Sequence, residues 1–364
     1  MSPQAVDLNF WRGKRVFVTG HTGFKGAWLC LWLQSMSAKV FGYSLAPETP
    51  SLFEQANVAE GISHTIGDVR DLGALTRAVT DARPDIVFHL AAQSLVRPSY
   101  ADPTGTFATN VMGTANLLEA VRQANQAFQK DGGAVTRAAV IVTTDKCYQN
   151  KEWHWSYRED DPLGGHDPYS ASKACAELVA ASYRTSFAQS QPHPAIATAR
   201  AGNVIGGGDW AKDRLVPDAV RAFAKQETLL IRHPNSIRPW QHVLEPLAGY
   251  VLLAQRLCES GNVFAQAWNF GPGAGGERTV GEVASLLAEH WGTGASWRVE
   301  GGEHLHEAQF LKLDSSKARA LLKWQPRLSL ALGIEMTASW YLAHQRGASP
   351  RQVSQEQIAK FSAS

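Results

Sequence analysis

The sequence has few cysteines and no long hydrophobic run, and both absences narrow the class of protein. Its 364 residues include only four cysteines, and none of them lies in a CxxC pair or at Cys/His ligand spacing. A disulfide framework or a structural zinc site is therefore not expected. No run of about 18 apolar residues occurs, and the N-terminus has no signal-peptide pattern. We expect a soluble, cytoplasmic protein with no membrane partner.

A strong charge of one sign is also missing. The chain has 35 basic and 33 acidic residues, which are interspersed and give a formal net charge of +2. Nucleic acid is not an expected partner, because its binding requires a basic patch or stripe. The twelve histidines are scattered, and His154 and His166 flank an acidic loop without partners at metal spacing. No metal site is expected.

The first 200 residues instead alternate short apolar strands with helical stretches. The pattern predicts strands over 15–19, 39–43, 62–68, 85–91, 138–143 and 195–201. It predicts helices over 26–36, 72–82, 103–129 and 169–189. Continuous apolar strands separated by helices are typical of a parallel sheet covered on both faces. The predicted fold class is α/β, with a doubly wound parallel sheet.

After Gly202 the sequence becomes rich in glycine, proline and tryptophan, which suits substrate-binding loops on a rigid sheet. The length also suggests one large domain and a smaller one. We predict a nucleotide-binding domain over 1–201 and 238–270 and a substrate domain over 202–237 and 271–346. Residues 347–364 are predicted to be a loosely ordered tail.

A glycine-rich loop follows the first predicted strand and opens the first helix. Its spacing is Gly20-x-x-Gly23-x-x-Gly26, which differs from GxGxxG. Such a loop makes a tight turn and lets pyrophosphate approach the free N–H groups of the helix. A plain tight turn is the alternative. The loop residues predicted to bind a dinucleotide are Gly20, Thr22, Gly23, Phe24, Lys25 and Gly26.

The residues that would bind the adenosine of the cofactor have a weaker sequence motif. The stretch after the second strand, 43–47, contains neither an acid for the ribose nor an arginine for a 2′-phosphate. NAD is therefore favoured over NADP. Asp68 and Val69, after the third strand, are candidates to hold adenine, and a surface turn is the alternative.

Tyr169 and Lys173 form a Tyr-x-x-x-Lys motif in a predicted helix after the fifth strand. This spacing places a phenol and an ammonium one helical turn apart, so the cation can lower the pKa of the phenol. The phenolate can then accept a proton from a substrate hydroxyl while hydride leaves the same carbon. The lysine can also bind the nicotinamide ribose.

Thr144, Asp145 and Lys146 lie where the fifth strand ends, at the sheet edge where ligands bind. With Tyr169 nearby, these side chains supply what elimination of water needs: a hydroxyl donor, an acid for the leaving group and an amine base. A lysine acts as a base only when its pKa is depressed by desolvation or a neighbouring cation. A simple cap of the next turn is the alternative for Thr144 and Asp145.

Several longer motifs resemble one family. They are TGHTGFKG at Thr19, GDVRD at Gly67, HLAAQSLVRPSY at His89, TTDKCYQN at Thr143, YSASK at Tyr169, RAGNVIGGGDWAKDRLVPD at Arg200 and RPWQHVLEPLAGY at Arg238. Together they are similar to the extended short-chain dehydrogenase/reductases, which have a Rossmann domain, and to the nucleotide-sugar 4,6-dehydratases within them. The dTDP-glucose and GDP-mannose branches have a glutamate where this chain has Lys146. The CDP-glucose branch has lysine there.

The resemblance implies a reaction. Tyr169, assisted by Lys173, would take the proton of the glucose 4-hydroxyl as hydride goes from C4 to NAD. Lys146 would then remove the C5 proton, and Asp145 would protonate the departing 6-hydroxyl while Thr144 holds the C4 oxygen. Return of hydride to C6 would give CDP-4-keto-6-deoxy-D-glucose from CDP-D-glucose. The implied role is deoxysugar biosynthesis, including that of lipopolysaccharide O-antigen.

The resemblance also implies further site residues. Cofactor contacts are expected at Leu90, Ala91 and Ala92. Substrate contacts are expected at Ser94, Arg97, Asn110, Asn203, Arg214 and Arg238, with surface salt bridges or helix and loop capping as the alternatives. Trp210 and Trp240 are equally suited to packing and to stacking on the base. Long helices near 103–129 and 169–189 imply a homodimer or a dimer of dimers.

Two other functions remain open from the residues alone. An epimerase of the same superfamily would keep Tyr169 and Lys173 but would not need Asp145 and Lys146. A sensor that binds NAD without turnover would be free to lose Tyr169, Lys173 and Asp145, all of which are present.

Overall fold

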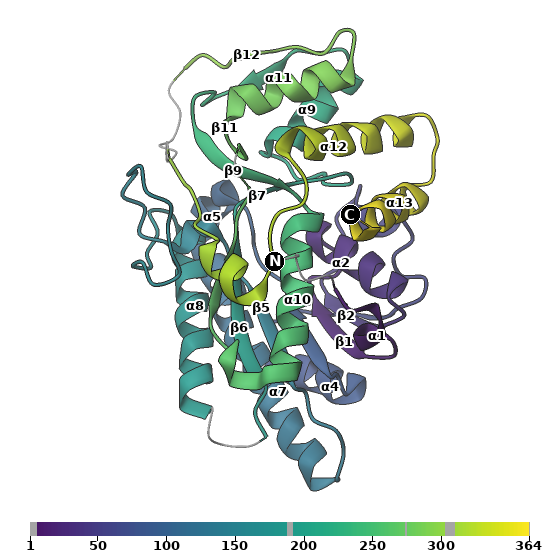
Figure 1. The fold of residues 1–364 in the computed structure, drawn as a ribbon, viewed down its shortest axis with the longest axis vertical. Coiled ribbons are helices and arrows are strands. Elements are labelled where there is room, and N and C mark those ends of the chain that lie inside the picture. The colour runs from purple at the N-terminus through teal and green to yellow at the C-terminus, as the bar shows by residue number, and fades with distance from the viewer. Residues whose placement is uncertain (1–5, 188–191, 274, 303–309, 364) are drawn as a thin grey trace.

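The computed structural model describes residues 6–187, 192–273, 275–302 and 310–363. Its centre is a seven-stranded sheet in the order β10-β6-β5-β4-β1-β2-β3, in which every neighbouring pair is parallel (Figure 1). The strands are β1 (Arg15–Thr19), β2 (Lys39–Ser44), β3 (Ser63–Ile66), β4 (Ile86–His89), β5 (Ala138–Val142), β6 (Ala195–Ala201) and β10 (Ala267–Phe270). The predicted doubly wound α/β fold is confirmed, and the strand order reverses between β1 and β4.

Helices cover both faces of this sheet because successive strand residues point to opposite sides. On β1, Val16 and Val18 pack in one buried cluster and Phe17 packs in another. The first cluster contains residues of α2 (Phe24–Ser35) and α10 (Leu244–Ser260). The second contains residues of α4 (Leu72–Ala82), α7 (Gly113–Lys130) and α8 (Pro168–Phe187). Strands β1, β4, β5 and β6 are therefore buried on both sides, as their apolar sequences predicted, whereas the edge strand β3 is exposed.

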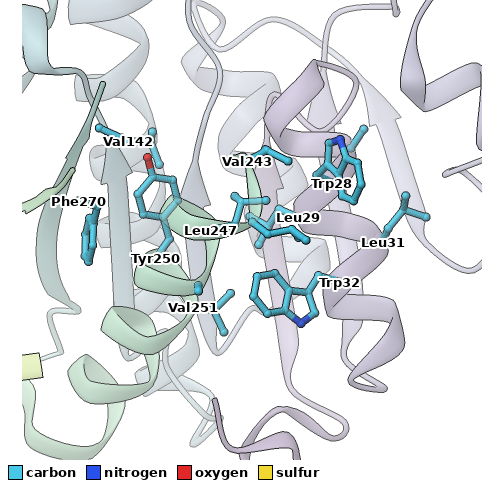
Figure 2. Packing of buried hydrophobic residues seen from close by; sticks show 14 of the residues in the cluster. Trp28, Leu29, Leu31, Trp32, Val142, Val243, Leu247, Tyr250, Val251 and Phe270 are labelled. Atoms are coloured by element: carbon cyan, nitrogen blue, oxygen red, sulfur yellow. The ribbon is translucent and has the colours of Figure 1, made fainter. Parts of the chain in front are cut away.

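The packing between α2 and α10 fixes the helix that follows the glycine loop. Figure 2 shows Leu29 and Trp32 of α2 lying beside Leu247 and Val251 of α10. All four side chains are buried. Burying a large apolar side chain stabilises a fold by about 1.5–3 kcal/mol. The N-terminus of α2 is thus held rigidly at the sheet edge.

The strands and helices predicted over 15–201 agree closely with observed elements, but the longest helix differs and several other elements were not predicted. The long helix predicted over 103–129 is divided into α6 (Pro103–Phe107), a π-helical segment η1 (Ala108–Met112) and α7. Strand β10 was not predicted, because its four residues, Ala-Trp-Asn-Phe, have no clear apolar run. It nevertheless pairs with β6 and completes the sheet.

A smaller region lies beyond the carboxyl ends of the parallel strands (Figure 1). It has a three-stranded sheet of β7 (Asn203–Ile205), β9 (Ile237–His242) and β11 (Glu277–Thr279), and a pair formed by β8 (Leu229–Ile231) and β12 (Trp297–Val299). Its helices are α9 (Leu215–Ala224), α11 (Val280–Trp291) and α12 (Leu330–Gln345). Because β9 pairs with β7 and β11, residues 238–242 join this smaller sheet, whereas we had assigned them to the larger domain. The domain boundaries otherwise stay a prediction.

Shorter elements connect these units. They are α1 (Leu8–Trp11), α3 (Leu52–Gln55), α5 (Val96–Ala101), and the 3-10 or π-helical turns η2 (Asp145–Cys147), η3 (Gly261–Val263) and η4 (Ala318–Leu322).

The expectation of a loosely ordered tail is wrong for the residues that the structure describes. Helix α13 (Pro350–Ala363) packs against α2 and α12, with Ile358 and Phe361 buried and the ring of Phe361 edge-on to Trp32 at 5.6 Å. The hydroxyl of Ser354 accepts a hydrogen bond from the indole of Trp340. Because most residues of the tail are polar, its few buried apolar residues were not recognised from the sequence.

Within the described ranges, no helix has both the length and the apolar character needed to cross a membrane. The same residues contain no cluster of three or more His, Cys, Asp or Glu side chains suited to a metal ion.

Candidate active site

The glycine loop lies at the carboxyl edge of the sheet, between β1 and α2. Gly20 has φ +73°, and a Cβ atom there would lie 2.6 Å from the backbone nitrogen of Ala91. Only glycine permits this approach between the loop and the segment after β4. Gly23 precedes α2 and provides no side-chain cap, so the first N–H groups of the helix are available to an anion. The loop therefore fits the diphosphate of a dinucleotide.

The other candidate cofactor residues surround this loop. Thr22 accepts from or donates to Ser44 at 2.9 Å and donates to the carbonyl of Leu45 at 3.1 Å, so it ties the loop to the end of β2. The amide of Ala91 donates to the hydroxyl of Thr19 at 3.3 Å. Leu90, Ala91 and Ala92 directly follow β4 and are all partly exposed at the same edge.

Asp68 and Val69 lie just beyond β3. The carboxylate of Asp68 forms an ion pair with Arg70 at 2.5 Å, and the hydrogen bonds from Arg70 hold the pKa of this acid below its usual value. The Val69 side chain is buried, and its carbonyl accepts a hydrogen bond from Asn116 at 3.0 Å. Both residues thus lie at the sheet edge where the structure places the glycine loop, and a role in holding adenine stays a prediction.

Thr144, Asp145 and Lys146 continue directly from β5 into the turn η2. The Thr144 hydroxyl caps this turn and donates to Oδ1 of Asp145 at 2.9 Å. Asp145 is 2 % exposed, and within the described residues its Oδ2 has no hydrogen-bond partner. Burial raises the pKa of Asp145 above its usual value, although Lys146, Thr144, Arg238 and Lys25 oppose the change. A carboxyl group that keeps its proton is suited to act as an acid.

Tyr169 and Lys173 lie in the first turns of α8, beside the end of β5. Burial raises the pKa of Tyr169 to about 12, and a hydrogen bond with Thr144 and the charge of Arg214 oppose this change. The ammonium of Lys173 donates to the carbonyl of Val142 at 3.1 Å, and burial lowers the pKa of this lysine to about 8. The lowered pKa expected for the Tyr169 phenol is therefore not found in this state, because burial outweighs the neighbouring cations.

A buried ion pair under these residues was not predicted from the sequence. Glu177, one turn after Lys173 on α8, pairs with Arg200 of β6 at 2.8 Å, and both side chains are almost fully buried. Thr143 and Thr198 also donate to the Glu177 carboxylate. The network joins the end of β5 to β6 and α8, close to the reactive side chains. Loss of one partner would leave a buried charge unpaired, which typically costs about 3–5 kcal/mol.

The Gly-Gly-Gly-Asp-Trp segment brings the smaller region against α2. The indole of Trp28 donates to the carbonyl of Gly207 at 2.9 Å. Asp209, which was not among the predicted site residues, is 4 % exposed and pairs with Arg214 at 3.0 Å. The hydroxyl of Tyr341 donates to the Asp209 carbonyl at 2.6 Å. Asp209 thereby fixes Arg214 at the start of α9.

Two of the predicted substrate residues after β4 are held by hydrogen bonds to the loop before α9. Arg214 donates to the Ser94 hydroxyl at 3.1 Å, and Arg97 pairs with Asp213 at 2.9 Å. These bonds join α5 and its preceding loop to the loop before α9. Asn110 is buried within η1 and donates to the Gln93 carbonyl and the Ser172 hydroxyl, so it orders the loop that carries Ser94.

The remaining predicted substrate residues come from the smaller sheet. Arg238 is 2 % exposed on β9, and its charge opposes the rise in the pKa of Asp145. Asn203 lies on β7 and is partly exposed. Trp240 is buried with its indole donating to the Arg278 carbonyl, and Trp210 donates to Gln55. Both tryptophans pack within the fold, which favours packing over stacking on a base.

A cavity of about 840 Å³ lies elsewhere, between the N-termini of α11 and α12. Its lining contains none of the predicted catalytic, cofactor or substrate residues. The chemistry of the side chains, and not this cavity, therefore identifies the candidate active site.

Comparison with known proteins shows the family of the chain. The sequence profile of the family described as GDP-mannose 4,6 dehydratase matches residues 17–337, which is most of the chain. The chain belongs to the GDP-mannose 4,6 dehydratase family. The matched region includes the glycine loop, the end of β5 and the first turns of α8.

The chain is also similar to individual proteins of known name. A CDP-glucose 4,6-dehydratase of Salmonella typhimurium is 50% identical over 361 residues, which cover 98% of each chain. A dTDP-glucose 4,6-dehydratase of Streptomyces griseus is 31% identical over 267 residues, 72% of this chain and 73% of the relative. The crystal structure of DesIV, a dTDP-glucose 4,6-dehydratase from Streptomyces venezuelae with NAD bound, superposes with a TM-score of 0.76 at 26% identity and covers 92% of this chain and 99% of its own.

Proposed function

We propose that this protein is an NAD-dependent CDP-D-glucose 4,6-dehydratase, which forms CDP-4-keto-6-deoxy-D-glucose and water. The observation that carries the proposal is the 50% identity over 98% of the chain to a curated CDP-glucose 4,6-dehydratase. The side chains at the end of β5 support the proposal. A phenol lies there near a carboxyl group whose pKa is raised by burial. An epimerase has no need of the second group.

NAD fits the residues around the glycine loop. The free N–H groups at the start of α2 would hold its diphosphate, Asp68 and Val69 its adenine, and Lys173 its nicotinamide ribose. When bound, the nicotinamide supplies a hydride acceptor for C4 and a hydride donor for C6. The hydride is returned within one turnover, so the overall reaction involves no net oxidation.

The first step assigned to the protein is proton removal from the glucose 4-hydroxyl. Tyr169 is the base, and Thr144, to which its phenol is hydrogen-bonded, holds the C4 oxygen. Loss of this proton and of the C4 hydride leaves a ketone at C4. The ketone acidifies the proton at C5, which makes the next step possible.

The second step is elimination of water between C5 and C6. Lys146 takes the C5 proton, the C6–O bond breaks, and Asp145 gives its proton to the departing hydroxyl. Burial favours the protonated form of Asp145, as this role requires. Addition of hydride at C6 and return of a proton at C5 then complete the 4-keto-6-deoxy sugar.

The diphosphate and the sugar of the substrate are assigned to different residues. Arg214 and Arg238 present guanidiniums suited to a diphosphate through paired donors. Ser94, Arg97, Asn110 and Asn203 lie near the sugar or shape its pocket, with Asn110 acting through the loop that it orders. Ser94 and Arg97 bond to the loop before α9, so binding of the sugar by these side chains would replace those bonds.

The assembly and setting of the enzyme are part of the proposal. We infer a homodimer, or a dimer of dimers, that pairs through α7 and α8. We also place the enzyme in the cytoplasm and in deoxysugar biosynthesis for lipopolysaccharide O-antigen. Measurement of the mass in solution tests the first of these inferences.

The nucleotide preference tests the proposed substrate. Purified protein with NAD is expected to convert CDP-glucose with a kcat/KM at least about tenfold above that for dTDP-glucose, because base-specific contacts of one site discriminate by this order or more. The product is measured through the absorbance of the 4-keto-6-deoxy sugar in alkali. Comparable turnover of dTDP-glucose would contradict the assignment to CDP-glucose.

A further inference from the structure

Lys25 is a cation in a position where a helix does not favour one. It is the second residue of α2, whose free N–H groups already carry the positive end of the helix dipole. Its side chain is only partly exposed. Among the residues that the structure describes, no hydrogen bond or ion pair involves its ammonium. An ammonium without a partner in the protein is available to bind an anion.

Charged groups from four other segments surround Lys25. Burial, followed by the charges of Arg214 before α9 and Lys173 on α8, lowers the pKa of Lys25 to about 8. Asp145 after β5 and Asp209 after β7 oppose this change. The ammonium therefore lies near the reactive side chains and near the loop before α9.

The two neighbouring carboxyl groups do not satisfy Lys25. Asp209 is committed to Arg214 at 3.0 Å and also accepts from the Ala211 amide. Asp145 shares its Oδ1 with Thr144, and burial favours its neutral form. Positive charge is therefore in excess around Lys25. The N–H groups of α2 would hold the diphosphate of NAD, and the proposed substrate brings a second diphosphate.

We propose that Lys25 of α2 binds the diphosphate of the sugar nucleotide together with Arg214. This inference rests on the proposed function. It is supported by the packing of α2 on the loop that follows β7. There the indole of Trp28 bonds to Gly207, and a Cβ at Gly206 would lie 3.2 Å from the ring of Phe24. A flexible lysine supplies a point charge to the phosphates, while the planar guanidinium of Arg214 can donate two parallel hydrogen bonds.

The proposal predicts a pH dependence. Only protonated Lys25 attracts the diphosphate, and the pKa of this lysine is about 8 in the free protein. Binding of the anion favours the charged form, so affinity is full below this pKa and falls as the pH rises through it. The other charged groups facing Lys25 are Arg214, Lys173, Asp145 and Asp209.

The test compares Lys25→Met with Lys25→Arg, and uses Lys39→Met, an exposed lysine at the start of β2, as the matched control. Calorimetric titration of NAD-saturated protein measures binding of CDP and of cytidine, which lacks the diphosphate. Lys25→Met is expected to weaken CDP binding about tenfold, to leave cytidine binding unchanged and to remove the fall in CDP affinity near pH 8. Lys25→Arg and Lys39→Met should bind CDP within about threefold of the unaltered protein.

Two results would overturn the inference. Unchanged CDP binding by Lys25→Met would show that the diphosphate does not contact this lysine. Weakened NAD binding with unchanged CDP binding would make Lys25 a cofactor residue. Failure of the unaltered protein to bind CDP would instead refute the proposed function, so the two failures are distinguishable.

Discussion

Replacement of Tyr169 by Phe is expected to lower kcat by about 10²–10⁴-fold, the usual effect of losing a general base. Only the phenolic oxygen is removed, so the packing of the 8 % exposed ring is preserved. Binding of NAD and CDP-glucose should stay within a few fold. Steady-state kinetics and equilibrium titration of each ligand measure the two quantities separately.

Tyr183→Phe is the matched control for this substitution. Tyr183 lies on the same helix, and its hydroxyl bonds to Glu119, away from β5. This variant should keep its turnover within about twofold. If Tyr169→Phe lost ligand binding by the same factor as turnover, Tyr169 would be a structural residue and the proposed base would be wrong.

Replacement of Lys146 by Ala is expected to stop the reaction after oxidation at C4. The C5 proton would have no base, so mixing with CDP-glucose should reduce bound NAD and leave a persistent NADH absorbance without product. Asp145→Asn should slow the same elimination, because the 6-hydroxyl would leave without a proton. Stopped-flow absorbance and product analysis follow the two stages.

Solvent-deuterium exchange at C5 decides the role of Lys146. Loss of this exchange in Lys146→Ala supports the lysine as the base, whereas exchange at a near-normal rate would assign the base to another group. Lys151→Ala is the control, since Lys151 lies in the same connecting loop and contacts the ring of Trp153. It should eliminate water at the normal rate.

The sequence predicts the middle of the central sheet well because β1, β4, β5 and β6 are buried on both faces. Continuous apolar runs such as Ala138–Val142 have no other stable place in a water-soluble fold. The positions of Gly20, Thr144 and Tyr169 follow from this sheet, since the carboxyl ends of parallel strands meet at one edge. The side chains predicted to be catalytic therefore lie together in the structure, and their roles stay a prediction.

Other features depend on contacts between distant segments and leave little local signal. Glu177 and Arg200 each look like ordinary helix and strand residues until the fold pairs them. Helix α13 appears polar, yet Ile358 and Phe361 are buried because α2 and α12 offer a surface to cover. The pKa of Tyr169 depends on total burial, which a Tyr-x-x-x-Lys spacing does not report.

The fate of the C4 hydrogen tests the proposed function most directly. CDP-glucose carrying deuterium at C4 is incubated with the protein and a catalytic amount of NAD, and the product is analysed by mass spectrometry and NMR. The account predicts that deuterium appears at C6 of the 4-keto-6-deoxy sugar and that no matching NADH accumulates. Stoichiometric NADH, or product without deuterium at C6, would contradict an internal return of hydride and would make the protein a simple dehydrogenase or another kind of enzyme.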